Sequence, residues 1–145
     1  MGVSEVLELF RLAMTGNDAA AMREGVEQVL GLSGGAGLSA DQEYEVRHPA
    51  YVMEMPQSNE RIRGRDAMRS MQETFPVPPT LTLRRVVGSG RVWVIEGVND
   101  YDGDLWHVAL VWELDHEGLI LRDTRYYAQR SEPPEWRAQW VEPLD

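Results

Sequence analysis

Apolar residues recur every three or four positions at the start of the chain. One face of a helix would carry Val3, Val6, Leu7, Phe10 and Met14. A second stretch with helical spacing covers residues 20–30, after a break at Gly16-Asn17-Asp18. Two helices are therefore predicted before residues 31–39, a glycine-rich segment without charges that is typical of a loop.

The middle of the chain changes from a strand pattern to a third helix pattern. Residues 43–56 alternate as a strand does, with Pro49 at a bend or an edge position. Residues 58–64 are predicted to turn the chain. Residues 65–75 then form the third predicted helix, which the prolines that follow bring to an end.

From residue 80 onward the pattern has a period of two, which predicts four strands. They are expected at residues 80–87, 91–101, 104–114 and 119–128. Asp102-Gly103 is a strong two-residue hairpin signal, and Asp115-His116-Glu117-Gly118 is a second turn signal. The last three strands are therefore predicted to form an antiparallel meander.

The two turns define a register for the meander. The first pairs Asn99 with Trp106, and the second, if it closes at Asp115 and Gly118, pairs Trp106 with Tyr127. One predicted face is apolar at one end and polar at the other. It carries Trp93, Ile95, Gly97, Asn99, Trp106, Val108, Leu110, Trp112, Leu121, Asp123, Arg125 and Tyr127.

The opposite face of the meander mixes apolar and charged side chains, which suits a contact between subunits better than bare solvent. It carries Val94, Glu96, Val98, His107, Ala109, Val111, Ile120, Arg122, Thr124 and Tyr126. A homodimer packed through this outer sheet face is predicted. In the tail that follows, Trp136 and Trp140 are expected to pack back onto the body of the protein.

Composition limits the classes of function. The 145 residues suffice for one domain with its own core, the chain has no cysteine, and its formal charge of −10 disfavours nucleic acid and anionic lipid as partners. No apolar run reaches the roughly 18 residues that a membrane span needs. The histidines His48, His107 and His116 are not spaced as a metal site. A cytoplasmic protein without metal or cofactor is expected.

Two segments carry a resemblance to a known superfamily. They are MEMPQSNERIRGRDAM at residues 53–68 and LILRDTRYYA at residues 119–128. With the two leading helices, this order of elements resembles the nuclear transport factor 2-like superfamily, and within it the SnoaL-like proteins, over nearly the whole chain. The resemblance implies one α+β domain over residues 1–145. In it a cone-shaped, curved antiparallel sheet and three helices close a central pocket, as in a cystatin-like α+β barrel.

The positions that carry chemistry in well-known members of that superfamily hold other residues here. The carboxylate base of ketosteroid isomerase would fall at Met55, and the Asp-Arg-Asp set of limonene epoxide hydrolase would fall at Gly97, Asn99 and Arg125. The pocket acid of SnoaL-type cyclases has a partial match in Asp123. Asp123 is the candidate catalytic acid or base, and a structural ion pair with Arg125 is the alternative.

A pocket for a small, largely apolar molecule is predicted on the inner face. Its expected lining is Tyr51, Met53, Met55, Asn99, Trp106, Arg125 and Tyr127. The favoured function is ligand binding without an identified reaction. The alternatives are a cofactor-independent isomerase, cyclase or epoxide hydrolase that uses Asp123, and a dimerising interaction module without a ligand.

Overall fold

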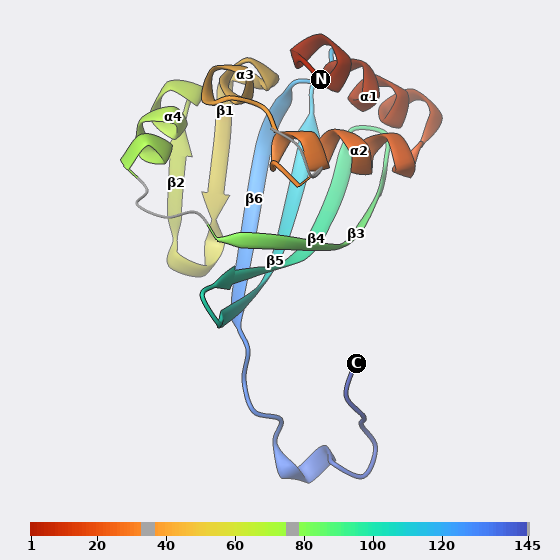
Figure 1. The fold of residues 1–145 in the computed structure, drawn as a ribbon, viewed down its shortest axis with the longest axis vertical. Coiled ribbons are helices and arrows are strands. Elements are labelled where there is room, and N and C mark those ends of the chain that lie inside the picture. The colour runs from red at the N-terminus through yellow and green to blue at the C-terminus, as the bar shows by residue number, and fades with distance from the viewer. Residues whose placement is uncertain (33–36, 75–78, 145) are drawn as a thin grey trace.

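Helices cover one side of a strongly curved sheet (Figure 1). The structure is a computed structural model that describes residues 1–32, 37–74 and 79–144. Its α-helices are α1 (Val3–Gly16), α2 (Ala19–Val29), α3 (Ala40–Val46) and α4 (Arg65–Thr74). Within these described ranges, no helix is long and apolar enough to span a bilayer. The predicted α+β class is confirmed, and α3 is an addition to the three predicted helices.

The sheet contains six strands in the order β2-β1-β6-β5-β4-β3. They are β1 (Arg47–Met55), β2 (Glu60–Arg63), β3 (Thr80–Ser89), β4 (Val92–Tyr101), β5 (Asp104–Leu114) and β6 (Ile120–Gln129). Strand β1 runs parallel to β6, and the other neighbouring pairs are antiparallel. The sheet is therefore mixed, although an antiparallel sheet was predicted. Because β1 and β6 are far apart in sequence, no hairpin forces them to run in opposite directions.

The hairpin between β4 and β5 has the predicted turn and the predicted register. Asp102 and Gly103 have φ angles of 55° and 97°, the positive values that a two-residue hairpin turn of this type requires. Asn99 pairs with Trp106, as expected. The meander of β4, β5 and β6 is confirmed.

The turn between β5 and β6 is longer than predicted. The backbone N–H of Asp115 donates to the carbonyl of Leu119 at 2.9 Å, and a bulge follows in the ladder. Tyr127 consequently pairs with Val108, and the predicted pairing with Trp106 is wrong. The error amounts to two residues, an even number. Side chains of β6 beyond the bulge therefore stay on the predicted face of the sheet.

Two short elements, α3 and β2, were not predicted. Ser39 caps α3: its hydroxyl accepts from the backbone N–H of Gln42 at 3.2 Å, and the Gln42 side chain accepts from the Ser39 N–H at 2.9 Å. The strand expected from residue 43 therefore begins at Arg47. Strand β2 replaces part of the predicted turn. Residues 33–36 of the expected loop and the end of the third predicted helix lie outside the described residues.

A close contact between β3 and β4 accompanies the bend of the sheet. A Cβ atom at Gly97 would lie 2.6 Å from the Thr82 carbonyl oxygen and 2.9 Å from Cδ1 of Leu81. The ladder shifts by one residue between Leu83 and Arg85 on β3. Bulges and glycines at such contacts are the usual means of curving a sheet.

The core fills one end of the concave face. Phe10 of α1 meets Trp112 of β5 edge to face, with ring centroids 6.1 Å apart. Helix α2 packs closely because Gly25 leaves room for the Phe10 ring. The rest of the concave face borders a cavity instead of a packed core.

The C-terminal tail does not pack back onto the protein. Trp136 and Trp140 are 73% and 72% exposed, so the expectation that they cover the body is wrong. Pro134 has an extended backbone, with φ −70° and ψ 145°, and a short helical turn, η2 (Glu135–Arg137), follows it. The prolines restrict the chain to an extended path, and the tail leads away from the sheet (Figure 1).

Candidate functional site

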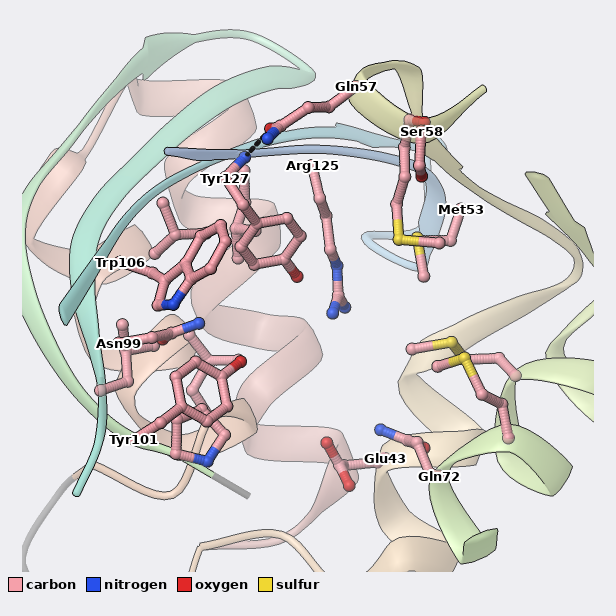
Figure 2. Close-up of a pocket in the computed structure, with 18 of the residues that line it drawn as sticks. Glu43, Met53, Gln57, Ser58, Gln72, Asn99, Tyr101, Trp106, Arg125 and Tyr127 are labelled. Atoms are coloured by element: carbon pink, nitrogen blue, oxygen red, sulfur yellow. Dashed lines mark hydrogen bonds between the residues drawn. The ribbon is translucent and has the colours of Figure 1, made fainter. Parts of the chain in front are cut away.

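An open cavity of about 1110 Å³ lies between the concave sheet face and the helices (Figure 2). Much of its wall is apolar or aromatic: Leu30, Met53, Met55, Met68, Met71, Pro79, Leu81, Tyr101, Trp106, Val108, Leu110 and Tyr127. Methionine side chains are unbranched and adapt to differently shaped ligands. The size and lining match those of pockets for small organic molecules.

Most of the predicted pocket residues lie on the cavity wall. They are Met53, Met55, Asn99, Trp106, Arg125 and Tyr127. Tyr51 and Asp123 do not line the cavity, because they are buried beneath its surface with 0% and 1% exposure. The structure thus brings the predicted residues together in two layers. The first is the cavity wall, and the second, which we call the support layer, consists of Tyr51 and Asp123 behind it.

The support layer fixes the Arg125 side chain. Its Nε and one terminal nitrogen donate to Oδ2 of Asp123 at 3.1 and 2.8 Å. The Tyr51 hydroxyl donates to the same oxygen at 2.7 Å. Oδ1 of Asp123 is buried and has no hydrogen-bond partner among the described residues. A buried charge pair held by several hydrogen bonds has a defined geometry.

Burial and the Asp123 charge determine how this cluster titrates. Burial alone would lower the pKa of Arg125, but the adjacent Asp123 carboxylate outweighs it and holds that pKa well above its ordinary value. Burial and the same carboxylate raise the pKa of Tyr51. Arg125 is therefore charged and Tyr51 is neutral at every physiological pH.

A second polar group faces Arg125 from the opposite wall. Glu43 of α3 and Gln72 of α4 point into the cavity below the guanidinium (Figure 2). Burial raises the pKa of Glu43, although Arg47, Arg125 and Gln72 oppose the shift. The Glu43 carboxylate lies 3.8 Å from a terminal nitrogen of Arg47. A carboxyl group with a raised pKa can exchange protons closer to neutral pH than an exposed one.

Hydrogen bonds hold the rim of the cavity together. Asp104 accepts from Nε1 of Trp106 at 3.0 Å and from the amide of Gln129 at 3.0 Å, and these bonds lower the pKa of Asp104. The Gln57 side chain accepts from the backbone N–H of Tyr127 at 2.8 Å. The rim therefore joins the hairpin of β4 and β5 to the ends of β1 and β6.

Glu43 and Gln72 were not predicted to line the cavity, because Glu43 falls in a segment with a strand pattern and no sequence signal marks Gln72. The Ser39-x-x-Gln42 capping signal could have revealed α3 and thereby the face on which Glu43 lies. Arg69 also borders the cavity, but it is paired with Asp41 and Glu73. In the described part of the chain, no group of three or more His, Asp or Glu side chains could hold a metal ion.

Solved structures similar to this chain share its fold. An NTF-2 like protein of unknown function from Burkholderia xenovorans LB400 is 24% identical, with a TM-score of 0.67 over 99% of this chain and 95% of that one. A presumed ketosteroid isomerase from Kribbella flavida DSM 17836 is 19% identical, with a TM-score of 0.70 over 98% and 91%. An LEH-like epoxide hydrolase from M. tuberculosis is 17% identical, with a TM-score of 0.53 over 87% and 82%.

The sequence itself gives no such match: no family model and no curated protein matches it. The similarity to solved structures is below 25% identity, so it concerns the arrangement of the backbone. The predicted resemblance is therefore confirmed for the fold. The chain has the nuclear transport factor 2-like fold.

Proposed function

We propose that the chain binds a small, largely apolar molecule whose hydrogen-bond-accepting group meets Arg125. The hydrogen bonding of the Arg125 side chain supports this proposal. Two of its nitrogens bond Asp123, and its remaining terminal nitrogen has no partner among the described residues, while the side chain reaches into the cavity (Figure 2). A prepositioned donor in an apolar cavity is the usual basis of ligand orientation.

The ion pair of Arg125 with Asp123 defines the class of ligand. Because Asp123 balances the charge of Arg125, the pair can accept a neutral carbonyl oxygen as well as an anion. Asn99 and Tyr127 add polar groups beside Arg125, and the methionine-rich wall covers the rest of the ligand. The expected ligand is an apolar or aromatic molecule with one carbonyl, phenolate, carboxylate or sulfonate group.

Two fluorescent probes test this proposal. Anilinonaphthalene sulfonate and N-phenyl-1-naphthylamine share an aromatic frame, but only the first carries an acidic group. Both should bind the folded protein, and Val108→Trp should weaken both by filling part of the cavity. Val111→Trp is the matched control, because Val111 lies on the opposite face of the same strand. Equal binding by the two variants would contradict a site in this cavity.

A second function, proton transfer on the bound molecule, is supported by Glu43. This carboxyl lines the cavity opposite Arg125, so a base and an oxyanion-stabilising group face the same space. Similar structures carry the names ketosteroid isomerase and epoxide hydrolase, which makes acid–base chemistry a reasonable candidate. NMR detection of solvent deuterium entering a bound cyclic ketone, lost in Glu43→Gln, tests it. If the wild type catalyses no exchange, ligand binding remains as the only supported function.

The predicted catalytic role of Asp123 becomes a positioning role in this proposal. Asp123 is behind the cavity wall, and its Oδ2 already accepts three hydrogen bonds. Such a carboxylate orients Arg125 without touching the ligand. A cavity of about 1110 Å³, with an apolar wall and a few polar groups, supports ligand binding over the third possibility, an interaction module without a ligand.

A further inference from the structure

The C-terminal tail presents large apolar side chains to solvent. Trp136, Trp140 and Leu144 are 73%, 72% and 83% exposed. Tryptophan is usually well buried, and clusters of exposed apolar side chains mark interaction sites. The tail leaves the domain at Arg130, whose N–H donates to the Leu105 carbonyl at 3.3 Å. The described residues of the same chain therefore leave both tryptophans uncovered, and the surface of another molecule could cover them.

The local structure of the tail holds the two tryptophans apart from their own domain. Pro133-Pro134 forms an extended spacer before η2. Two turn hydrogen bonds then order the segment, from Ala138 N–H to the Glu135 carbonyl at 3.1 Å and from Trp140 N–H to the Arg137 carbonyl at 3.0 Å. A stiff spacer followed by an ordered turn favours contact with another molecule over contact with the same domain.

A positively charged surface lies on the convex face of the sheet, in a chain whose net charge is −10. We call it the arginine patch, and it consists of Val52, Glu54, Arg61, Arg63, Arg122 and Tyr126. Register places these side chains on one face, since Val52 pairs with both Arg63 and Arg122. Glu54 contacts Arg61 at 3.1 Å and Arg122 at 3.3 Å. Two arginines thus share one carboxylate. Arg63 lies on the same face, and so does Tyr126, which is 47% exposed.

We propose that the tail of one molecule docks on the arginine patch of a second copy of the chain. Residues 131–144 carry Glu132, Glu135 and Glu142 against the single Arg137, so their charge is opposite to that of the patch. Indole rings stack well on guanidinium groups and on aromatic rings. Reciprocal docking of two tails gives a closed two-fold dimer. This contact gives the predicted homodimer a specific structural basis.

Sedimentation equilibrium of the full chain at micromolar concentration tests the tail. The wild type should be a dimer, and Trp136→Ser with Trp140→Ser should raise its dissociation constant by about 100-fold or more, as expected for interface tryptophans. The matched variant with phenylalanine at both positions should retain most of the association. A monomeric wild type, or a dimer unaffected by the serine substitutions, would overturn the proposal.

A charge exchange tests the receiving surface. Arg63→Glu with Arg122→Glu should weaken the dimer, and so should Glu132→Arg with Glu135→Arg, because each brings like charges together. Mixing these two proteins should restore association, since the altered tail then meets an altered patch of opposite charge. A cooperative thermal unfolding transition like that of the wild type shows that each variant is folded. If the mixture associates no better than either protein alone, the tail does not dock on the arginine patch.

Discussion

Arg125 donates two hydrogen bonds to a single oxygen of Asp123, at 3.1 and 2.8 Å, in a site where Asp123 is 1% exposed. Replacing Asp123 by Asn would leave the guanidinium charge buried without its counterion. We expect the free energy of unfolding to fall by about 3 to 5 kcal/mol, the usual cost of breaking a buried pair from one side. Urea unfolding at neutral pH measures this.

Tyr51→Phe is the control for that substitution. It removes one hydrogen bond to the same Asp123 oxygen but leaves the ion pair intact. We expect a loss of about 1.5 to 3 kcal/mol and little change in the affinity for anilinonaphthalene sulfonate. If Asp123→Asn proved no more destabilising than Tyr51→Phe, the carboxylate would not be acting as a buried counterion.

Glu43 should make stability depend on pH. Its folded-state pKa is raised above the ordinary 4.5, so the folded state holds the proton more tightly than the unfolded state does. The resulting stabilisation is fully present below pH 4.5 and is lost as pH rises through the folded-state pKa. Unfolding measured between pH about 4 and about 7 should show this loss in the wild type and not in Glu43→Gln.

Glu45→Gln is the matched control for Glu43, because Glu45 lies on the same helix and is exposed. Its pH profile should follow that of the wild type. Parallel profiles for Glu43→Gln and the wild type would mean that Glu43 is not buried against the cavity, and the proposed proton transfer would have no base.

Gly97→Ala should destabilise the curved sheet. The added methyl group would lie 2.6 Å from the Thr82 carbonyl oxygen, so β3 and β4 would have to separate. The expected cost is about 1 to 3 kcal/mol, measured by thermal or urea unfolding. Gly16→Ala, where no atom lies within 4 Å of the new Cβ, should be neutral or stabilise α1 by up to about 1 kcal/mol. Equal effects would show that the close contact is not needed for the bend.

Strong local signals predicted much of the fold from the sequence. The Asp102-Gly103 turn determined the register of β4 and β5, because its two positive φ angles admit a single hairpin geometry. The second turn was mispredicted because a bulge near Leu114 adds residues that no pattern marks. The parallel pairing of β1 with β6 depends on contacts between distant segments, and local periodicity contains no information about these.

The candidate site was predictable on the sheet and not on the helices. Alternation along β1, β4, β5 and β6 places Met53, Asn99, Trp106 and Arg125 on one face, and all four line the cavity. The curvature of the sheet decides which of these residues form the cavity wall and which lie behind it. The alternation of side chains along β6 therefore could not predict the buried position of Asp123. Glu43 was not predicted for a different reason: its segment was expected to be a strand, although Ser39 and Gln42 carry the capping signal of helix α3.

We expect Arg125 to orient a bound ligand through the acceptor group of that ligand, and a comparison of probe affinities tests this role. Fluorescence titration of Arg125→Met with the two naphthalene probes should show sulfonate binding weakened by roughly 10-fold or more, since the charged hydrogen bond is lost. Binding of the uncharged amine should be nearly unchanged. Arg122→Met, which removes a convex-face arginine three residues away on β6, should bind both probes as the wild type does. Equal sulfonate affinity in Arg125→Met and the wild type would show that Arg125 does not orient the ligand.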